Sequence, residues 1–89
     1  MKSRTTTQFR TAFLELPKQV QKQAREAYNQ FKSDPTYPSL HFKKVHQNLP
    51  IYSVRINKSY RAVGQMDKDT IIWFWVGSHT EYESLLAHF

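Results

Sequence analysis

The sequence predicts an α+β protein: an N-terminal helical hairpin packed on one face of a small antiparallel β-sheet, followed by a short C-terminal helix. Three observations support this prediction. Apolar residues recur at three- and four-residue intervals in the first third, two-residue alternation governs residues 51–66, and residues 71–76 form an apolar run. The chain has 89 residues, enough for one modest core. We therefore expect residues 1–89 to form a single domain.

Two helices are predicted in the first third of the chain. The first has Thr6 or Thr7 available as its N-cap residue, and Pro17 ends it and can begin the next helix. Two prolines in the segment 33–38 prevent further helix and predict a loop. The apolar face of the first helix consists of Phe9, Ala12, Phe13 and Leu16, and that of the second consists of Val20, Ala24, Ala27, Tyr28 and Phe31.

The remainder of the chain is predicted to be mainly strands. Residues 40–45 form a short strand, 51–56 and 60–66 form a hairpin, and 71–76 form the most apolar strand. Because this last strand is apolar on both faces, we expect it inside the sheet rather than at its edge. Trp73 and Trp75 are expected to share one of its faces, where they either pack beneath the terminal helix or form a stacking platform for bases. That helix is predicted to begin at the capping-box sequence Thr80-Glu-Tyr-Glu83.

The predicted hairpin brings two arginines together. Ile56 is expected to pair with Tyr60 across a three-residue loop. In that register Arg55 lies directly opposite Arg61, on the face of the sheet that the helices leave open. Like charges in this position are destabilising, so a fold that retains them usually holds an anion such as phosphate between them. In the alternative register the loop is one residue shorter, and the two side chains point to opposite faces.

The composition favours a polyanionic partner. Thirteen Lys and Arg against seven Asp and Glu give a net charge of +6, which suits nucleic acid, an anionic membrane or an acidic protein, although such a charge can equally serve only to keep a domain soluble. No apolar run reaches membrane-spanning length, so we expect no membrane association. The absence of cysteine and the polar first seven residues, which contain no secretory leader, favour a cytoplasmic location. The four histidines lack metal-ligand spacing and the two glycines form no phosphate loop, so we expect neither metal nor cofactor.

Further candidate functional residues surround the arginine pair. Lys43 and Lys44 precede the hairpin, and one of them is expected to join the arginines, although each can equally be a solvated side chain. His79 follows the apolar strand, where it could act as a general acid or base or simply lie on the surface at the helix entry. Tyr82 could stack on a base, contact a phosphate or pack the terminal helix.

The chain resembles the RelE/ParE superfamily of bacterial toxin–antitoxin toxins over nearly its whole length. The resemblance implies a toxin that is neutralised by a cognate antitoxin, which we expect to be acidic. In the RelE branch it implies an enzyme that enters the ribosome and cuts messenger RNA without a metal, because the ribose 2′-OH attacks the adjacent phosphate. The segments that carry the resemblance are Phe13-Leu-Glu-Leu-Pro17, Asp34-Pro35, Leu40-His-Phe-Lys-Lys-Val45, Tyr52-Ser-Val-Arg-Ile56, Tyr60-Arg-Ala-Val63 and Trp73-Phe-Trp-Val-Gly-Ser-His-Thr-Glu-Tyr82.

The resemblance also implies roles for individual residues. Arg61 matches the strand arginine that contacts the scissile phosphate, and His79 matches the proton-transfer position of histidine-bearing members. Supporting and RNA-contacting positions would be Arg55, Lys43 or Lys44, and Tyr82.

Two departures from the family pattern concern catalysis. Thr80 stands where many RelE-type members have an arginine, and the segment 39–44 lacks the glutamate that some relatives use as a base. Two other functions are therefore kept beside the endonuclease: a ParE-like inhibitor of DNA gyrase that cuts nothing, and a non-toxic binding module with the same fold. The histidine at position 79 discriminates between them, because a gyrase inhibitor needs no proton-transfer group.

Overall fold

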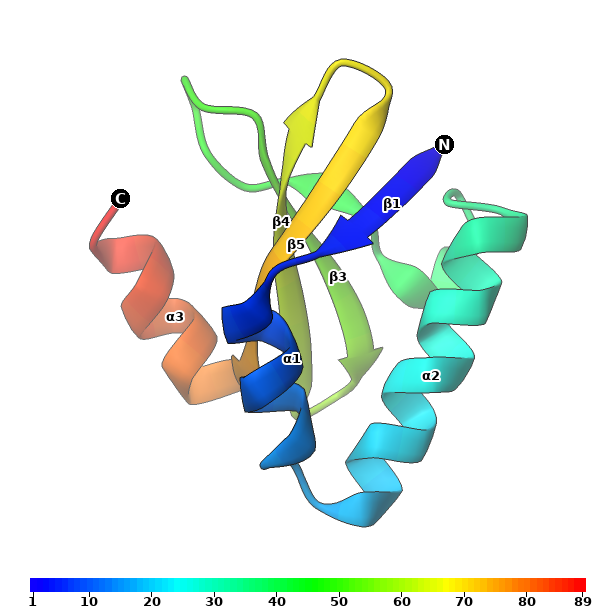
Figure 1. Ribbon diagram of the computed structural model, residues 1–89. Coiled ribbons are helices and arrows are strands. Elements are labelled where there is room, and N and C mark those ends of the chain that lie inside the picture. The colour runs from blue at the N-terminus through cyan, green and yellow to red at the C-terminus, as the bar shows by residue number, and fades with distance from the viewer.

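The computed structural model describes residues 1–89, which form three helices and a five-stranded sheet (Figure 1). The strand order is β1-β5-β4-β3-β2. No helix has the length and hydropathy needed to cross a bilayer. The elements are β1 (Lys2–Thr5), α1 (Thr7–Leu14), α2 (Lys18–Ser33), β2 (Lys43–Lys44), β3 (Ile51–Asn57), β4 (Tyr60–Asp67), β5 (Thr70–Ser78) and α3 (His79–Ala87).

The predicted α+β class is confirmed, but the sheet is mixed rather than purely antiparallel. Strand β1 pairs with β5 in parallel, whereas the other three pairings are antiparallel. As predicted, β5 lies inside the sheet, between β1 and β4. The strand expected over 40–45 is mostly wrong: residues Pro38–Leu40 form a 3₁₀ turn, and His41 adopts a left-handed conformation with φ of 46°. Only Lys43 and Lys44 pair with β3.

A threonine and a buried glutamine fix the helical hairpin. The Thr6 hydroxyl accepts a hydrogen bond from the Phe9 N–H at 3.1 Å, which confirms it as the N-cap of α1. The Gln21 side chain donates to the carbonyls of Leu14 and Leu16 at 3.1 and 2.9 Å. These carbonyls at the end of α1 have no partner in the helix, so the glutamine satisfies them and joins α2 to α1.

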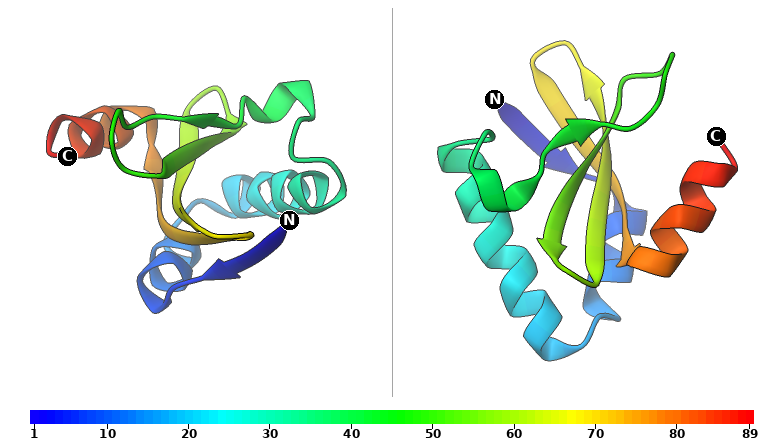
Figure 2. Two further views of the ribbon diagram at one scale, coloured as in Figure 1. Left: turned by 90° about the horizontal axis from the view of Figure 1, so that it is seen from above. Right: turned by 180° about the vertical axis from the view of Figure 1, so that it is seen from behind.

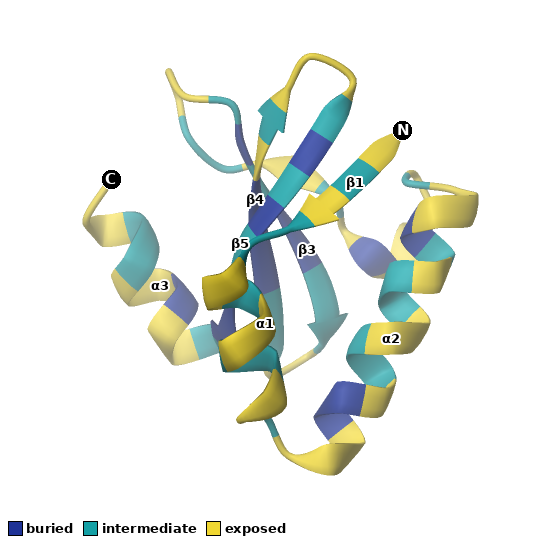
Figure 3. Ribbon diagram, viewed as in Figure 1, coloured by how far each residue is buried: buried dark blue, intermediate teal, exposed yellow.

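Helices lie on both sides of the sheet (Figure 2), and each face of the sheet carries an apolar cluster. On the face covered by α1 and α2, Phe31 of α2 packs edge-on against Trp73 with ring centroids 5.4 Å apart. On the opposite face, Tyr82 of α3 packs against Ile51 and Val63. The buried residues therefore concentrate in the central strands, while the helix surfaces turned away from the sheet are exposed (Figure 3). The sequence predicted that the helices leave this second face open, but α3 partly covers it.

The two tryptophans of β5 lie on opposite faces, so the prediction that they share one is wrong. Val63 pairs with Trp75 but the next residue, Gly64, pairs with Trp73, which leaves Phe74 as the extra residue of a β-bulge. Trp73 therefore enters the α2 cluster, where its indole N–H donates to the Ser3 hydroxyl at 3.0 Å. Trp75 instead packs beneath α3, beside Tyr82.

Gly64 is required by the close approach of Trp73. A Cβ at this position would lie 2.8 Å from Cε3 of Trp73 and 2.9 Å from Cγ1 of Ile71. Both neighbours are buried, so neither can move aside without disturbing the core.

We expect Gly64→Ala to destabilise the fold by about 1–3 kcal/mol, the usual cost of overpacking a core. The free energy of unfolding in urea measures this loss. Gln65→Ala is the matched control, because Gln65 is exposed on the same strand and its truncation should change stability by less than about 0.5 kcal/mol. Equal stability of the two variants would contradict the assigned packing of Trp73 over the glycine.

Candidate functional site

The β3–β4 hairpin places Arg55 directly opposite Arg61. Residues opposite each other in an antiparallel pair have side chains on the same face, so the predicted shared face is confirmed. The predicted pairing of Ile56 with Tyr60 is wrong, because Asn57 pairs with Tyr60 and Ile56 is the extra residue of a β-bulge. The loop is thus one residue shorter than expected, and the bulge compensates for the difference.

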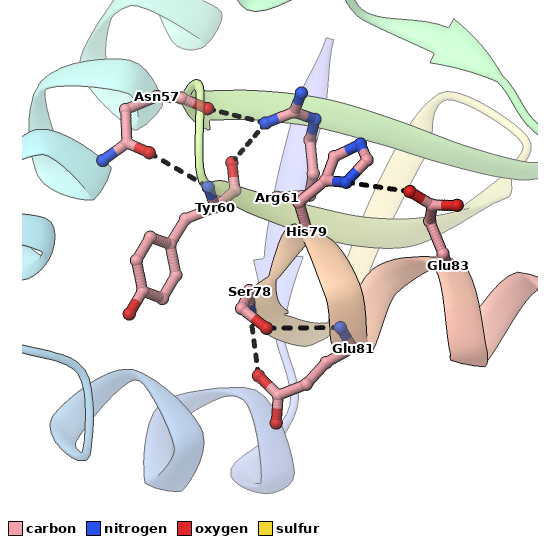
Figure 4. Close-up of polar contacts among 7 residues, drawn as sticks. All are labelled: Asn57, Tyr60, Arg61, Ser78, His79, Glu81 and Glu83. Atoms are coloured by element: carbon pink, nitrogen blue, oxygen red, sulfur yellow. Dashed lines mark hydrogen bonds and ion pairs between the residues drawn. The ribbon is translucent and has the colours of Figure 1, made fainter.

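Asn57 builds the tight turn of this hairpin (Figure 4). Its side-chain oxygen accepts hydrogen bonds from the N–H groups of Ser59 and Tyr60 at 2.7 and 3.0 Å, and Figure 4 shows the bond from Tyr60. Its side-chain amide donates to Gln23 of α2 at 2.7 Å. The hairpin tip is therefore tied to the helical layer, which limits its movement relative to the rest of the site.

The Arg61 guanidinium is held by the hairpin tip without a carboxylate partner. Its Nη1 donates to the carbonyls of Asn57 and Tyr60 at 2.6 and 3.0 Å (Figure 4). Partial burial and then the charge of Arg55 lower the pKa of Arg61, although an arginine remains charged at neutral pH. Neither arginine forms an ion pair, since the only ion pairs are Lys2–Asp69 and His79–Glu83. Two neighbouring cations without internal anions form a favourable place for a phosphate.

The strand register distinguishes the two lysines. Lys43 pairs with Ser53, which lies two residues from Arg55 on the same face. Lys44 pairs with Tyr52 and so belongs to the opposite face, which carries the α2 cluster. Both lysines are exposed at the sheet edge. Of the two candidates, Lys43 is the one that joins the arginine face, and Lys44 is not part of it.

His79 is the first residue of α3 rather than a residue before it. The capping box lies at Ser78 and Glu81, not at Thr80 and Glu83 as the sequence analysis predicted: the Ser78 hydroxyl accepts from the Glu81 N–H at 3.2 Å, and the Glu81 carboxylate accepts from the Ser78 N–H at 2.9 Å. The His79 N–H donates to the Ser59 carbonyl of the hairpin loop at 2.7 Å. This bond holds the histidine beside the same hairpin tip that binds the Arg61 guanidinium.

Ionised Glu81 contributes to this cap, and its effect on stability depends on pH. The hydrogen bonds with Ser78 lower the Glu81 pKa below 4.5. A carboxyl whose pKa is lower in the folded state contributes stability above its unfolded pKa and loses it as pH falls through the folded pKa. We expect the free energy of unfolding of the wild type to exceed that of Glu81→Gln at pH 7, and the difference to shrink as pH falls below about 4.5. A difference that does not change with pH would contradict this role.

Glu83 is a site residue that the sequence analysis missed. Its Oε1 lies 3.0 Å from Nδ1 of His79, one helical turn away. His79 and Glu83 have the i,i+4 spacing in the sequence, but their pairing was not predicted because Glu83 was assigned to the capping box. A carboxylate at Nδ1 orients the imidazole and leaves Nε2 available for proton transfer.

Tyr82 packs against the sheet, and the structure gives it no exposed surface for stacking on a base. The residue is 7% exposed, and its hydroxyl donates to the Ser53 hydroxyl at 3.1 Å. Its ring centroid lies 5.9 Å from that of His79. The structure thus favours the packing alternative, in which Tyr82 supports the histidine.

A shallow cavity of about 350 Å³ lies between the hairpin tip and the start of α3. His79 and Lys58 both line it, so Lys58 is a further cation beside the imidazole that the sequence analysis did not consider. Thr80, which stands in place of the arginine expected from the family, lines the same cavity. The arrangement combines unpaired cations with a partly exposed imidazole, and these groups can bind an anion and transfer a proton.

A sequence model described as the ParE-like toxin domain matches residues 18–84, more than half of the chain. No curated protein matches in sequence. The fold is shared with a chain of the RelB–RelE antitoxin–toxin complex from Methanococcus jannaschii, with a TM-score of 0.73 and 17% identity over 91% of this chain and 95% of that one.

Two further solved structures have the same fold. A chain of the RelBE2 toxin–antitoxin complex from Mycobacterium tuberculosis gives a TM-score of 0.68 and 21% identity over 88% of this chain and 96% of that one. YafQ from Escherichia coli strain BL21(DE3) gives a TM-score of 0.70 and 6% identity over 91% of this chain and 96% of that one. These likenesses show the fold, and the family match over residues 18–84 shows the family: the protein belongs to the ParE-like toxin domain family, within the RelE/ParE superfamily of toxin–antitoxin toxins.

Proposed function

We propose that this toxin is a metal-independent endoribonuclease that cleaves messenger RNA on the ribosome and so inhibits translation. The observation that carries the proposal is the unpaired Arg55–Arg61 couple, with His79 held against the same hairpin tip. Transesterification of an RNA linkage needs cations that bind the phosphate and stabilise its developing charge, and a group that transfers protons. The arginine pair and the nearby imidazole can supply these two functions.

In the proposed reaction the ribose 2′-oxygen attacks the adjacent phosphorus. The new O2′–P bond forms and the P–O5′ bond breaks, which yields a 2′,3′-cyclic phosphate and a 5′-hydroxyl end. The 2′-hydroxyl loses a proton and the leaving 5′-oxygen gains one, and His79 carries one of these transfers at Nε2. Arg61 stabilises the charge that develops on the phosphoryl oxygens, an effect worth about 2.7–4 kcal/mol for a single oriented donor.

The supporting groups follow from the geometry. Arg55 and Lys43 lie on the same face as Arg61 and would hold the flanking phosphates. Glu83 is a positioning residue that fixes the His79 ring. Lys58 lines the cavity at Thr80 and could supply the positive charge that this position has in many relatives.

An acidic antitoxin is the proposed partner. The toxin carries a net charge of +6, and the similar structures from M. jannaschii and M. tuberculosis were solved as antitoxin–toxin complexes. Charge complementarity favours binding over the basic face. The proposed substrate places the toxin's action in the cytoplasm.

Sequencing of RNA ends after brief induction tests the proposal. We expect new 5′-hydroxyl ends within translated messages and an early arrest of protein synthesis. Intact messages in arrested cells would overturn it.

Inhibition of DNA gyrase is the second candidate, because the matching family model is the ParE-like one. A gyrase inhibitor would cause DNA damage signalling before translation fails and would leave messages uncut. If expression caused no growth defect, the chain would instead be a non-toxic binding module.

A further inference from the structure

A polar cavity of about 400 Å³ lies between α2, β3 and the 3₁₀ turn. It is separate from the cavity at His79 and from the apolar cleft between the two N-terminal helices. Its size falls within the range of small-ligand sites, roughly 300–1,000 Å³. The polar and charged side chains that line it are Gln23, Glu26, Gln30, Tyr37, Ser39, Arg55 and Asn57.

The cavity contains an unpaired charge of each sign. Glu26 and Arg55 both line it, yet neither forms an ion pair anywhere in the structure. Opposite charges in one cavity that remain more than 4.0 Å apart leave room between them for a ligand with its own donors and acceptors. Leu40 and Ile56 add apolar surface to the same cavity, which suits the face of a planar ring.

Two residues connect this cavity to the proposed phosphate site. Arg55 lines the cavity and also lies opposite Arg61. The Asn57 carbonyl accepts a hydrogen bond from the Arg61 guanidinium. The Asn57 side chain donates a hydrogen bond to Gln23, which also lines the cavity. A nucleotide whose phosphate lies at the arginine pair would therefore have the cavity directly beside it.

We propose that this cavity binds the nucleobase of a nucleotide that flanks the cleaved linkage, and that it selects guanine. Guanine presents two N–H donors, N1 and N2, to a carboxylate such as Glu26, and its acceptors O6 and N7 to a guanidinium such as Arg55, whose five N–H donors suffice for both the base edge and an adjacent phosphate. No other RNA base combines a paired donor edge with a paired acceptor edge in this way. Tyr37, which is 39% exposed at the rim, provides an aromatic face for stacking.

The inference rests on the proposed RNA cleavage for its biological role, but base binding can be measured without cleavage. Guanosine and adenosine 3′-monophosphates are titrated into the purified ¹⁵N-labelled chain, with the side-chain amide signals of Gln23 and Gln30 as probes. We expect guanosine monophosphate to shift these signals at lower concentration. Glu26→Gln should reduce the guanine-to-adenine preference at least about fivefold, because an amide can accept only one of the two guanine donors.

Two control variants sharpen the binding measurement. Glu15→Gln removes an exposed carboxylate at the end of α1, away from the cavity, and should leave binding unchanged. Tyr37→Ala should weaken the binding of both nucleotides about fivefold or more, because it removes the stacking ring. Tyr37→Phe should bind them as the wild type does, because the ring remains.

Mapping of RNA ends provides the second measurement. Wild-type cleavage should be enriched at linkages flanked by guanine, and Glu26→Gln should lose this enrichment while still cutting. Cleavage without base preference, together with unshifted cavity signals, would overturn the pocket but keep the nuclease. Guanine-selective binding without any cleavage would keep the pocket and overturn the nuclease. Cavity signals that respond only to a protein partner would also overturn the nucleobase assignment.

Discussion

Replacing Arg61 with lysine is expected to reduce messenger RNA cleavage by about 10²–10³-fold, the usual loss when one oriented oxyanion donor is removed. Lysine keeps the charge but not the planar fork of donors. Arg61 uses Nη1 for two backbone carbonyls and has its other N–H groups free for phosphate, and an ammonium cannot reproduce both sets of bonds. The measurement is the single-turnover rate on programmed ribosomes.

Arg4→Lys is the matched control for this experiment. Arg4 is exposed on the edge strand β1, and its side chain forms no hydrogen bond or ion pair, so its replacement should leave the rate unchanged. Because Arg61→Lys also loses bonds to the hairpin-tip carbonyls, unfolding curves of both variants are recorded, and the rates are compared under conditions in which both variants are folded. If Arg61→Lys cut at the wild-type rate, Arg61 would not be the group that stabilises the transition state.

Replacing His79 with alanine is expected to lower cleavage by about 10²–10⁴-fold, the range of general acid–base catalysis. Because the side chain is half exposed, its loss should leave the fold intact. Glu83→Gln should have a smaller effect of about tenfold, because the amide still lies beside Nδ1 but no longer favours one orientation of the ring. The RNA-end assay and the growth of induced cells measure both variants.

A substrate with sulfur in place of the leaving 5′-oxygen assigns the proton transfer. A thiolate leaves without protonation, so this substrate should restore the rate of His79→Ala if the histidine is the acid. An unrestored rate would assign the base role instead. A His79→Ala variant that remains fully toxic, with DNA damage and uncut messages, would support the gyrase inhibitor.

The elements with strong periodicity could be predicted, whereas the positions of the bulges could not. The alternation around Val54 and Ala62 identifies the hairpin and its buried face because burial is regular there. At Ile56 and Phe74 one extra residue interrupts the ladder, and nothing in the local composition marks it. The bulge at Ile56 is offset by the shorter loop, so the prediction that Arg55 lies opposite Arg61 is correct. The bulge at Phe74 is not offset, so the prediction that the two tryptophans share a face is wrong.

The positions of the candidate site residues could be predicted where one pattern fixes them, and were missed where two patterns compete. The alternation of the hairpin placed Arg61 opposite Arg55, and His79 was placed after the last strand. Glu83 was missed because two overlapping Ser/Thr-x-x-Glu sequences compete for the start of α3, and backbone geometry selects the one at Ser78. The cavity beside Arg55 could not be predicted because it forms only when α2 packs beside β3, which no local pattern encodes.

The pairing of β1 with β5 joins the earliest strand to the latest one. Residues 2–5 find their neighbours only at residues 70–73, so the ladder spans most of the chain. During synthesis the N-terminal segment must therefore wait, unpaired, until the final third has emerged, and such non-local closure is slow. A message truncated before codon 70 would yield a polypeptide without β5, the strand that joins β1 to β4, and we expect that product to be degraded rather than to accumulate.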